Sequence, residues 1–227
     1  MQSEIIARPA TAAVKIFLEM GETIVTESGS MLAMSEHLRI ETTSRTRKGG
    51  MLSGLKRLFA GENFFLNHFT AVAAQQELLL APALLGDITH HVLETGTLIA
   101  QATSWLASNG TVHIDTTWQG FSSALFSGEG IFWLRLSGQG DIWFNSFGAI
   151  YTIDVEDSYI VDTGHIVAFE DTLKFSIRKA SHSWIGSFLG GEGLVCEFKG
   201  RGKLYCQTHN PPTFGSVLGP MLKPRRE

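Results

Sequence analysis

Histidine offers the widest choice of chemistry in this sequence, because it binds transition metals and transfers protons near neutral pH. The chain has eight histidines. A cupin-like metal-dependent enzyme would need a His-x-His pair followed by Glu and a further His, and no His-x-His occurs. His90 and His91 are adjacent, so on a strand they point to opposite faces and cannot bind one ion together. The others are His37, His68, His113, His165, His182 and His209. We expect hydrogen-bonded or surface side chains, no metal, no cofactor and no catalytic residue.

Acidic residues form two recurring sets beside glycines. The members are Glu27, Glu94 and Asp162, each two residues before a glycine, and Glu62, Glu129 and Glu192, each directly after one. A ring of such carboxylates could bind a cation or have raised pKa values through mutual repulsion. Acids beside glycines also accept hydrogen bonds from backbone N–H groups in turns, and we expect this structural role.

Motifs for other kinds of catalysis are missing from the sequence. It contains no Gly-x-Ser-x-Gly elbow, no phosphate-binding P-loop and no Gly-x-Gly-x-x-Gly fingerprint. An enzyme is therefore the minority hypothesis, with a cupin-like metal-dependent catalyst as its form.

A basic segment interleaved with apolar residues is the strongest charged feature. Its candidate contact residues are Arg45, Arg47, Lys48, Met51, Leu52, Leu55, Lys56, Arg57, Leu58 and Phe59. Such an amphipathic segment can lie on anionic lipid or meet an acidic partner. The alternative is a solvated loop that leads into an arm packed against the body or a neighbouring subunit.

Composition limits the class of protein. The chain has 227 residues, a formal net charge of −4, 18% charged residues, 24 glycines and 15 phenylalanines. These values exclude disorder, collagen and coiled coil, and they give no electrostatic case for nucleic acid as the main partner. The start has no basic region followed by an apolar core, and the most apolar run, 78–85, is about half of the ~20 residues that span a bilayer. We expect a cytoplasmic protein.

Internal similarity predicts the architecture. Residues 24–33, 92–100 and 160–168 share a pattern whose glycines, Gly29, Gly96 and Gly164, are 67 and 68 residues apart. The Gly-Glu landmarks at Glu62, Glu129 and Glu192 recur with spacings of 67 and 63. Two landmarks in the same order predict a triplicated unit of about 65 residues. We expect units at 1–82, 83–149 and 150–213, a tail at 214–227, and one compact domain.

Each unit has strand-like alternation and one short apolar arm before its Gly-Glu landmark. In the second and third units, strands flank Gly138-Gln139-Gly140 and Gly200-Arg201-Gly202, which predicts hairpins with three-residue loops. Cys196 and Cys206 would then face each other across the third hairpin. The matching residues of the second unit, Leu134 and Phe144, are apolar, so we expect free cysteines that act as small core residues.

The segments 138–148 and 202–208, together with the triplication, resemble a widespread family whose eukaryotic members are called altered-inheritance-of-mitochondria proteins. The resemblance covers residues 1 to about 212. It implies three fused repeats that are each similar to a subunit of the tryptophan-RNA-binding attenuation protein (TRAP), a short double-stranded β-helix, about a pseudo-threefold axis. No enzymatic activity is established for the family.

The sequence therefore predicts an all-β protein of three TRAP-like repeats closed about a pseudo-threefold axis. Low charge and many aromatics favour a homo-oligomer. The leading function is a non-enzymatic scaffold or binding protein of unknown biochemical activity, with apolar arms that contact protein or an anionic membrane. Single-stranded RNA binding is a further alternative by fold analogy, but no basic pattern for RNA recurs in all three units.

Overall fold

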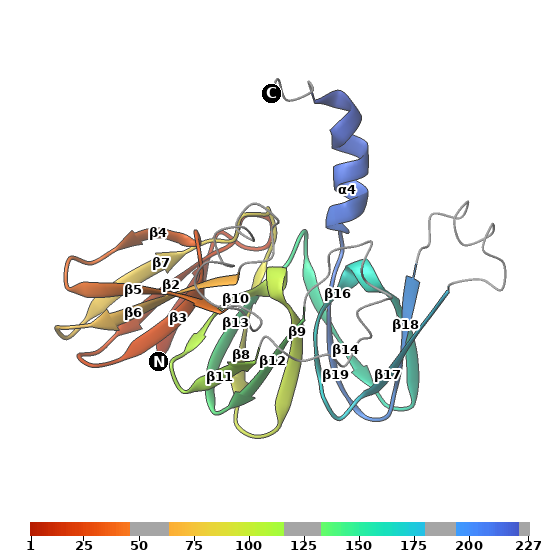
Figure 1. Ribbon diagram of the computed structural model, residues 1–227, viewed down its shortest axis with the longest axis horizontal. Coiled ribbons are helices and arrows are strands. Elements are labelled where there is room, and N and C mark those ends of the chain that lie inside the picture. The colour runs from red at the N-terminus through yellow and green to blue at the C-terminus, as the bar shows by residue number, and fades with distance from the viewer. Residues whose placement is uncertain (46–63, 116–132, 180–193, 223–227) are drawn as a thin grey trace.

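The computed structural model describes residues 1–45, 64–115, 133–179 and 194–222, and most of these lie in antiparallel β-sheets (Figure 1). One short helix, α4 (Pro211–Leu218), stands out from the sheets after the last strand and is followed by the single turn η3 (Gly219–Met221). The predicted all-β class is confirmed apart from this helix. Within the described ranges, no helix is long and apolar enough to cross a membrane.

The first group of strands occupies the N-terminal third of the chain. Its strands are β1 (Gln2–Ile6), β2 (Ala13–Leu18), β3 (Thr23–Glu27), β4 (Met31–Met34), β5 (Leu38–Arg45), β6 (Phe64–Ala71) and β7 (Gln76–Leu80). Four of them form a sheet in the order β1-β2-β7-β4, and β5-β6-β3 form half of a second sheet. Alternating apolar residues such as Ile16, Leu18 and Ile24 are fully buried in the core between these sheets.

The strands of the second group pair with one another in the same order as those of the first group. Its strands are β8 (Ile88–Leu93), β9 (Thr97–Gln101), β10 (Trp105–Asn109), β11 (Val112–Asp115), β12 (Trp133–Gly138) and β13 (Gly140–Asn145), with the turn η1 (Ala102–Ser104) between β9 and β10. β10, β13 and β8 continue the sheet of the first group, because β10 pairs with β3. β11, β12 and β9 form half of a third sheet.

The third group completes the chain of sheets. Its strands are β14 (Ile150–Val155), β15 (Ser158–Asp162), β16 (Ile166–Glu170), β17 (Lys174–Lys179), β18 (Leu194–Lys199) and β19 (Gly202–Gln207), with the turn η2 (Thr163–His165) between β15 and β16. β16, β19 and β14 join the third sheet, because β16 pairs with β9. β15, β18 and β17 form a last sheet of their own.

The three groups lie in a row, with the first at one end and the third at the other (Figure 1). Among the described strands, β4 pairs only with β7 and β15 only with β18. The predicted closure of the three units within one chain is therefore not seen in the described strand pairing. The row has an edge strand at each end.

The predicted Gly-x-Gly hairpins are wrong. β12 pairs with β9 and β11, whereas β13 pairs with β8 and β10, so the strands on either side of Gln139 belong to different sheets. β18 and β19 are separated in the same way. Gly138 has a φ of +101° and Gly200 of +115°, which lets the chain turn from one sheet onto the sheet stacked against it. Alternation looks the same in both arrangements, so the pattern did not distinguish them.

The cysteines consequently do not form a cross-strand pair. Cys196 and Cys206 lie on different sheets but in the same apolar cluster, where both are buried and free. Burial raises the pKa of each thiol to about 12. The predicted role as small core residues is confirmed.

The predicted match of Gly29, Gly96 and Gly164 is wrong for Gly96. Gly29 lies between β3 and β4, and Gly164 lies in the corresponding turn between β15 and β16. Gly96 lies between β8 and β9, where its counterpart in the first group is Gly21. Gly21, Gly29 and Gly96 have φ values of +86°, +85° and +87°, so two different turns require the same residue.

Gly86 provides a test of the close packing between connecting segments. A Cβ at this position would collide with the backbone carbonyl oxygen of Ser146, which the neighbouring connection holds in place. We expect Gly86→Ala to lower the free energy of unfolding by about 3 kcal/mol or more in urea denaturation, because backbone must move. Gly215→Ala in α4 is the control, since its Cβ meets open space. Equal stability of both variants would contradict this packing.

Candidate functional site

His90 and His91 lie in β8 and have different partners, in agreement with their predicted orientation toward opposite faces of a strand. His90 Nε2 lies 2.7 Å from Asp141 Oδ1, and its ring stacks on Trp143 with centroids 5.1 Å apart. His91 Nδ1 lies 2.8 Å from the Tyr205 hydroxyl of the third group. Burial lowers the pKa of His91. Within the described ranges, no group of three His, Cys, Asp or Glu side chains is arranged to hold a metal ion.

Other histidines are hydrogen-bonded side chains of the fold. His68 Nε2 lies 3.0 Å from Thr43 Oγ1, and His165 Nδ1 lies 2.8 Å from the carbonyl oxygen of Gln207. His209 Nδ1 lies 2.9 Å from Thr208 Oγ1. These three contacts confirm the structural interpretation for the histidines that make them, whereas His182 lies outside the described residues.

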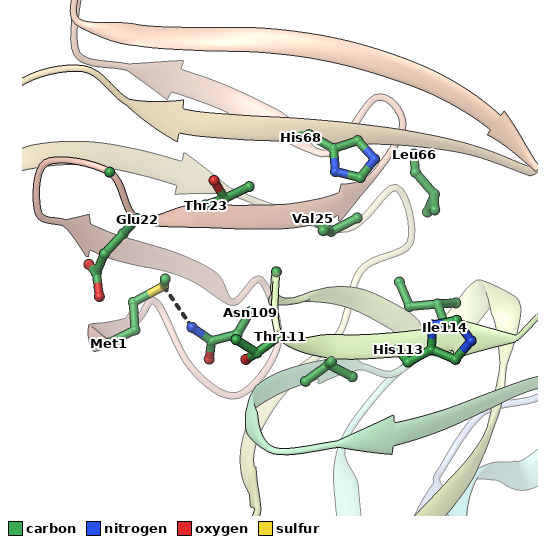
Figure 2. Close-up of a pocket in the computed structure, with 13 residues that line it drawn as sticks. Met1, Glu22, Thr23, Val25, Leu66, His68, Asn109, Thr111, His113 and Ile114 are labelled. Carbon is green, nitrogen blue, oxygen red and sulfur yellow. Dashed lines mark hydrogen bonds between the residues drawn. The ribbon is translucent and has the colours of Figure 1, made fainter.

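A pocket of about 630 Å³ opens where β3 and β6 face β11 of the second group (Figure 2). Val25, Leu66 and Ile114 provide apolar lining, and His68 and His113 lie on its two sides. Several of the polar lining groups already have partners within the chain. Thr23 Oγ1 lies 2.9 Å from Thr70 Oγ1, Glu22 Oε2 accepts a hydrogen bond from the Glu19 N–H, and Asn109 Oδ1 accepts one from the Asp141 N–H. The pocket is thus a gap between two groups of strands, and Thr23, Glu22 and Asn109 of its lining are already bonded within the chain.

The first set of recurring acids does not form a ring. Asp162 Oδ1 accepts a hydrogen bond of 2.8 Å from the Gly164 N–H, which confirms the turn role for this residue. Glu27 also ends a strand before a turn, but Glu94 follows β8 and is exposed in a different turn. Glu62, Glu129 and Glu192 lie outside the described residues.

Glu27 lies at the junction between the first two groups. It is the last residue of β3 and pairs with Leu66, which packs in the apolar cluster of the second group. Burial raises its pKa to about 7. Gln101, the last residue of β9, occupies the corresponding place and donates from Nε2 to the carbonyl oxygen of Thr163 across the next junction. A neutral side chain therefore suits this position.

The predicted contact residues lie at the end of β5 and in the segment between β5 and β6. The structure describes only the first of them. Arg45 ends β5, and Arg47, Lys48, Met51, Leu52, Leu55, Lys56, Arg57, Leu58 and Phe59 lie outside the described residues. The three apolar arms fall in 46–63, 116–132 and 180–193, each between two antiparallel partners: β5 and β6, β11 and β12, β17 and β18.

The bases of these three segments lie at one end of the molecule. β6, β12 and β18 begin beside the last residues of β3, β9 and β15, as the pairs Glu27–Leu66, Gln101–Trp133 and Asp162–Val195 show. The turns that follow contact the connections between groups, because Ala81 N–H donates to Ser30 and Asn145 Nδ2 donates to Thr103. We call this the contact end, formed by the turns 28–30, 102–104 and 163–165 and the connections 81–87, 146–149 and 208–210.

α4 also leaves from the contact end. The Leu85 carbonyl accepts from Gly148 N–H, and the Ala149 carbonyl accepts from Thr208 N–H, so the connections bond in series up to the start of the helix. Asn210 caps the helix by accepting from Thr213 N–H. α4 and η3 have no buried residue, and their exposed apolar side chains are Phe214, Val217, Leu218 and Met221.

Sequence reasoning missed this helix, since the residues after 213 were interpreted as a tail. Asn210 followed by Pro211 and Pro212 was the available signal, because an Asn cap before proline at the first helical positions is typical of a helix start.

Glu27→Gln tests the environment at the first junction. In the wild type, the unfolded chain loses the Glu27 proton near pH 4.5, while the folded chain keeps it until about pH 7. The stabilisation of the folded state by the neutral Glu27 side chain is therefore full below pH 4.5 and lost as the pH rises through 7. At about 1.4 kcal/mol per pH unit, this lowers the free energy of unfolding by roughly 3 to 4 kcal/mol. We expect the variant to lack this part of the pH dependence in urea titrations at pH 5 and 8. An unchanged pH dependence would contradict the burial of Glu27.

Comparison with known proteins gives one family. The family profile described as Mitochondrial biogenesis AIM24 matches residues 3–209. An uncharacterised protein of Streptococcus pyogenes serotype M6 is 29% identical over 215 residues, which are 90% of this chain and 84% of that protein. A crystal structure of a Streptococcus pyogenes protein is similar with a TM-score of 0.77 and 25% identity, and the match covers 97% of this chain and 99% of that one. The chain therefore belongs to the family described as Mitochondrial biogenesis AIM24, whose match spans almost the whole sequence.

Proposed function

We propose that this protein is a non-enzymatic scaffold that holds apolar segments at its contact end against an anionic membrane surface. The observation that carries the proposal is that four such segments start from the same end of the molecule. The three arms begin and end at the contact end, and α4 starts there with no buried residue and with Phe214, Val217 and Leu218 exposed. Each arm is rich in apolar residues, as Leu55-Lys56-Arg57-Leu58-Phe59, Leu125-Phe126 and Phe188-Leu189 illustrate.

Charge favours an anionic surface as the partner. The arms with Arg45, together with residues 211–227, carry eight Lys or Arg residues and four Glu residues, whereas the whole chain has a formal net charge of −4. The cations lie in the first arm and after α4, which itself has none. Apolar side chains beside cations are the combination that binds interfacially to anionic lipid. The proposal keeps the protein in the cytoplasm, in agreement with two buried free thiols.

The proposed scaffold consists of three copies of one TRAP-like unit, formed by β2–β7, β8–β13 and β14–β19 within one compact domain. A recurring bulge supports this interpretation. The ladder shifts between Met31 and Ala33, between Trp105 and Ala107, and between Ile166 and Ala168. Each shift lies on the third strand of a unit, β4, β10 or β16, where it pairs with the last strand of the same unit. A bulge is a specific feature of a strand pair, so three in the same place favour common origin over chance.

The bulges also revise the proposed repeat. Met31, Trp105 and Ile166 are 74 and 61 residues apart, in place of the 67 and 68 predicted from the glycines. Unit boundaries then fall in the connections 81–87 and 146–149 and at 208–210, close to the predicted boundaries at 82, 149 and 213.

Vesicle binding tests the function. We expect the protein to cosediment with vesicles containing phosphatidylserine and not with phosphatidylcholine vesicles. Arg47→Gln with Lys48→Gln should weaken binding at least tenfold, because each cation near an anionic surface contributes about 1 kcal/mol. Val217→Ser with Leu218→Ser should weaken it by removing the apolar contacts of α4.

Val92→Ser is the control, because Val92 is exposed on β8 away from the contact end. Equal binding of both double variants and the control would contradict the proposal. Absence of vesicle binding would also contradict it; capture of a protein partner that depends on Val217 and Leu218 would then favour a protein-binding scaffold.

A further inference from the structure

At the two ends of the row, β4 and β15 lack the neighbour that the corresponding strands have at the internal junctions, and we infer that β15 of one copy of this chain pairs with β4 of a second copy, head to tail. The inference rests on the proposed scaffold in one respect: the three units must be copies, so that an edge at one end has the shape of a junction elsewhere. Both edges belong to the same chain, one in the first unit and one in the third.

The two internal junctions define what such an edge binds. At the first, β3 pairs with β10 through Thr26–Ala107, Val25–Ser108 and Ile24–Asn109. At the second, β9 pairs with β16 through Ala100–Ala168, Ile99–Phe169 and Leu98–Glu170. In both, the second strand of one unit meets the third strand of the next unit. β15 is the second strand of the last unit and β4 is the third strand of the first, so each edge presents one half of the same junction.

The exposed apolar residues at the edges occupy positions that are buried at both internal junctions. On the β4 side, Leu32 is 58% exposed, whereas Leu106 and Val167 in the corresponding positions are fully buried. Met34 is 39% exposed, and its counterparts Ser108 and Phe169 are also fully buried.

The β15 side has the same contrast. Ile160 is 48% exposed, against 5% for Val25 and 1% for Ile99. Tyr159 is 47% exposed, while its counterparts Ile24 and Leu98 are buried. These apolar side chains have the burial pattern of a junction that lacks its other half.

We infer that a second copy of this chain covers each edge, because the two edges match in the register of their strands as well as in their exposed apolar side chains. Carrying the internal register to the edges pairs Ala33 with Val161, Met34 with Ile160 and Ser35 with Tyr159 of the second copy. At the internal junctions, the Gly110 N–H donates to Thr23 over 2.9 Å and the Asp171 N–H donates to Thr97 over 3.0 Å. The corresponding bond at the new junction runs from the Glu36 N–H to the Ser158 carbonyl.

The edges also lack the features by which proteins keep an edge strand unpaired. β4 has the sequence Met-Leu-Ala-Met, without charge or proline, and β15 carries its one charge at its last residue, Asp162. Charged side chains and proline usually protect exposed edges. A head-to-tail contact between identical chains closes into a ring when its rotation allows, and a ring would leave neither β4 nor β15 without a partner on that side.

Mixed cysteine variants test the pairing. Met34→Cys in one preparation and Ile160→Cys in another should form an interchain disulfide when mixed under mild oxidation, because directly paired residues have Cβ atoms about 4.5–5.5 Å apart. Neither variant alone should cross-link, since each Cys would face the native residue of its neighbour. Val92→Cys mixed with Ile160→Cys is the negative control, because Val92 is exposed but lies on neither edge.

Met34→Lys with Ile160→Lys should reduce the mass found by light scattering to that of one chain, with unchanged circular dichroism. The inference would be overturned if the wild-type protein were monomeric at a concentration on the order of 50 µM. It would also be overturned if the lysine variant kept its oligomeric mass, or if cross-linking were no greater in the mixture than in the control. These outcomes leave vesicle binding as a separate measurement, so edge pairing and the proposed function fail independently.

Discussion

Each group of strands depends on its neighbour to complete its sheets and to cover its apolar side chains. Val25 and Leu66 belong to the first group but pack in the apolar cluster of the second. Leu106 and Trp143 of the second group pack in the cluster of the first, and Trp133 packs in that of the third. Because burial is the main stabilising contribution in folding, no group is expected to be stable without an adjoining group.

The two ends of the molecule contain different kinds of connection between the strands. The turns and connections of the contact end hydrogen-bond in series, which fixes the bases of the arms and of α4. The opposite end contains the Gly-x-Gly connections that carry the chain between stacked sheets. Under the proposed function, this hydrogen-bonded framework is what holds several apolar segments at one end.

The sequence predicted what alternation and residue type determine. It indicated β-structure, buried thiols and separate partners for His90 and His91, and all three are found. It did not predict which strands pair, because alternation shows that a face is buried without showing what covers it. The hairpin at Gly200 and the facing pair of cysteines failed for this reason.

The repeat register failed for a different reason. Gly96 was matched with Gly29 because both follow an acid and a small residue within a similar apolar pattern, yet they belong to different turns that each have a glycine with positive φ. Pairing across groups could not be inferred at all, since Val25 and Ile160 have similar apolar neighbours in sequence but differ in exposure from 5% to 48%. Only the three-dimensional arrangement shows that one junction position is occupied and the other is open.

The central claim is that the second and third strands of every unit are completed by a strand of a neighbouring unit. Hydrogen exchange of the backbone amides in β4 and β15 tests it most directly. The account predicts that the amides of these strands that point away from β7 and β18 are protected in concentrated solution to a degree similar to those of β3 and β10, and that this protection is lost on dilution. Rapid exchange of these amides at every concentration, beside slow exchange in β3 and β10, would contradict it.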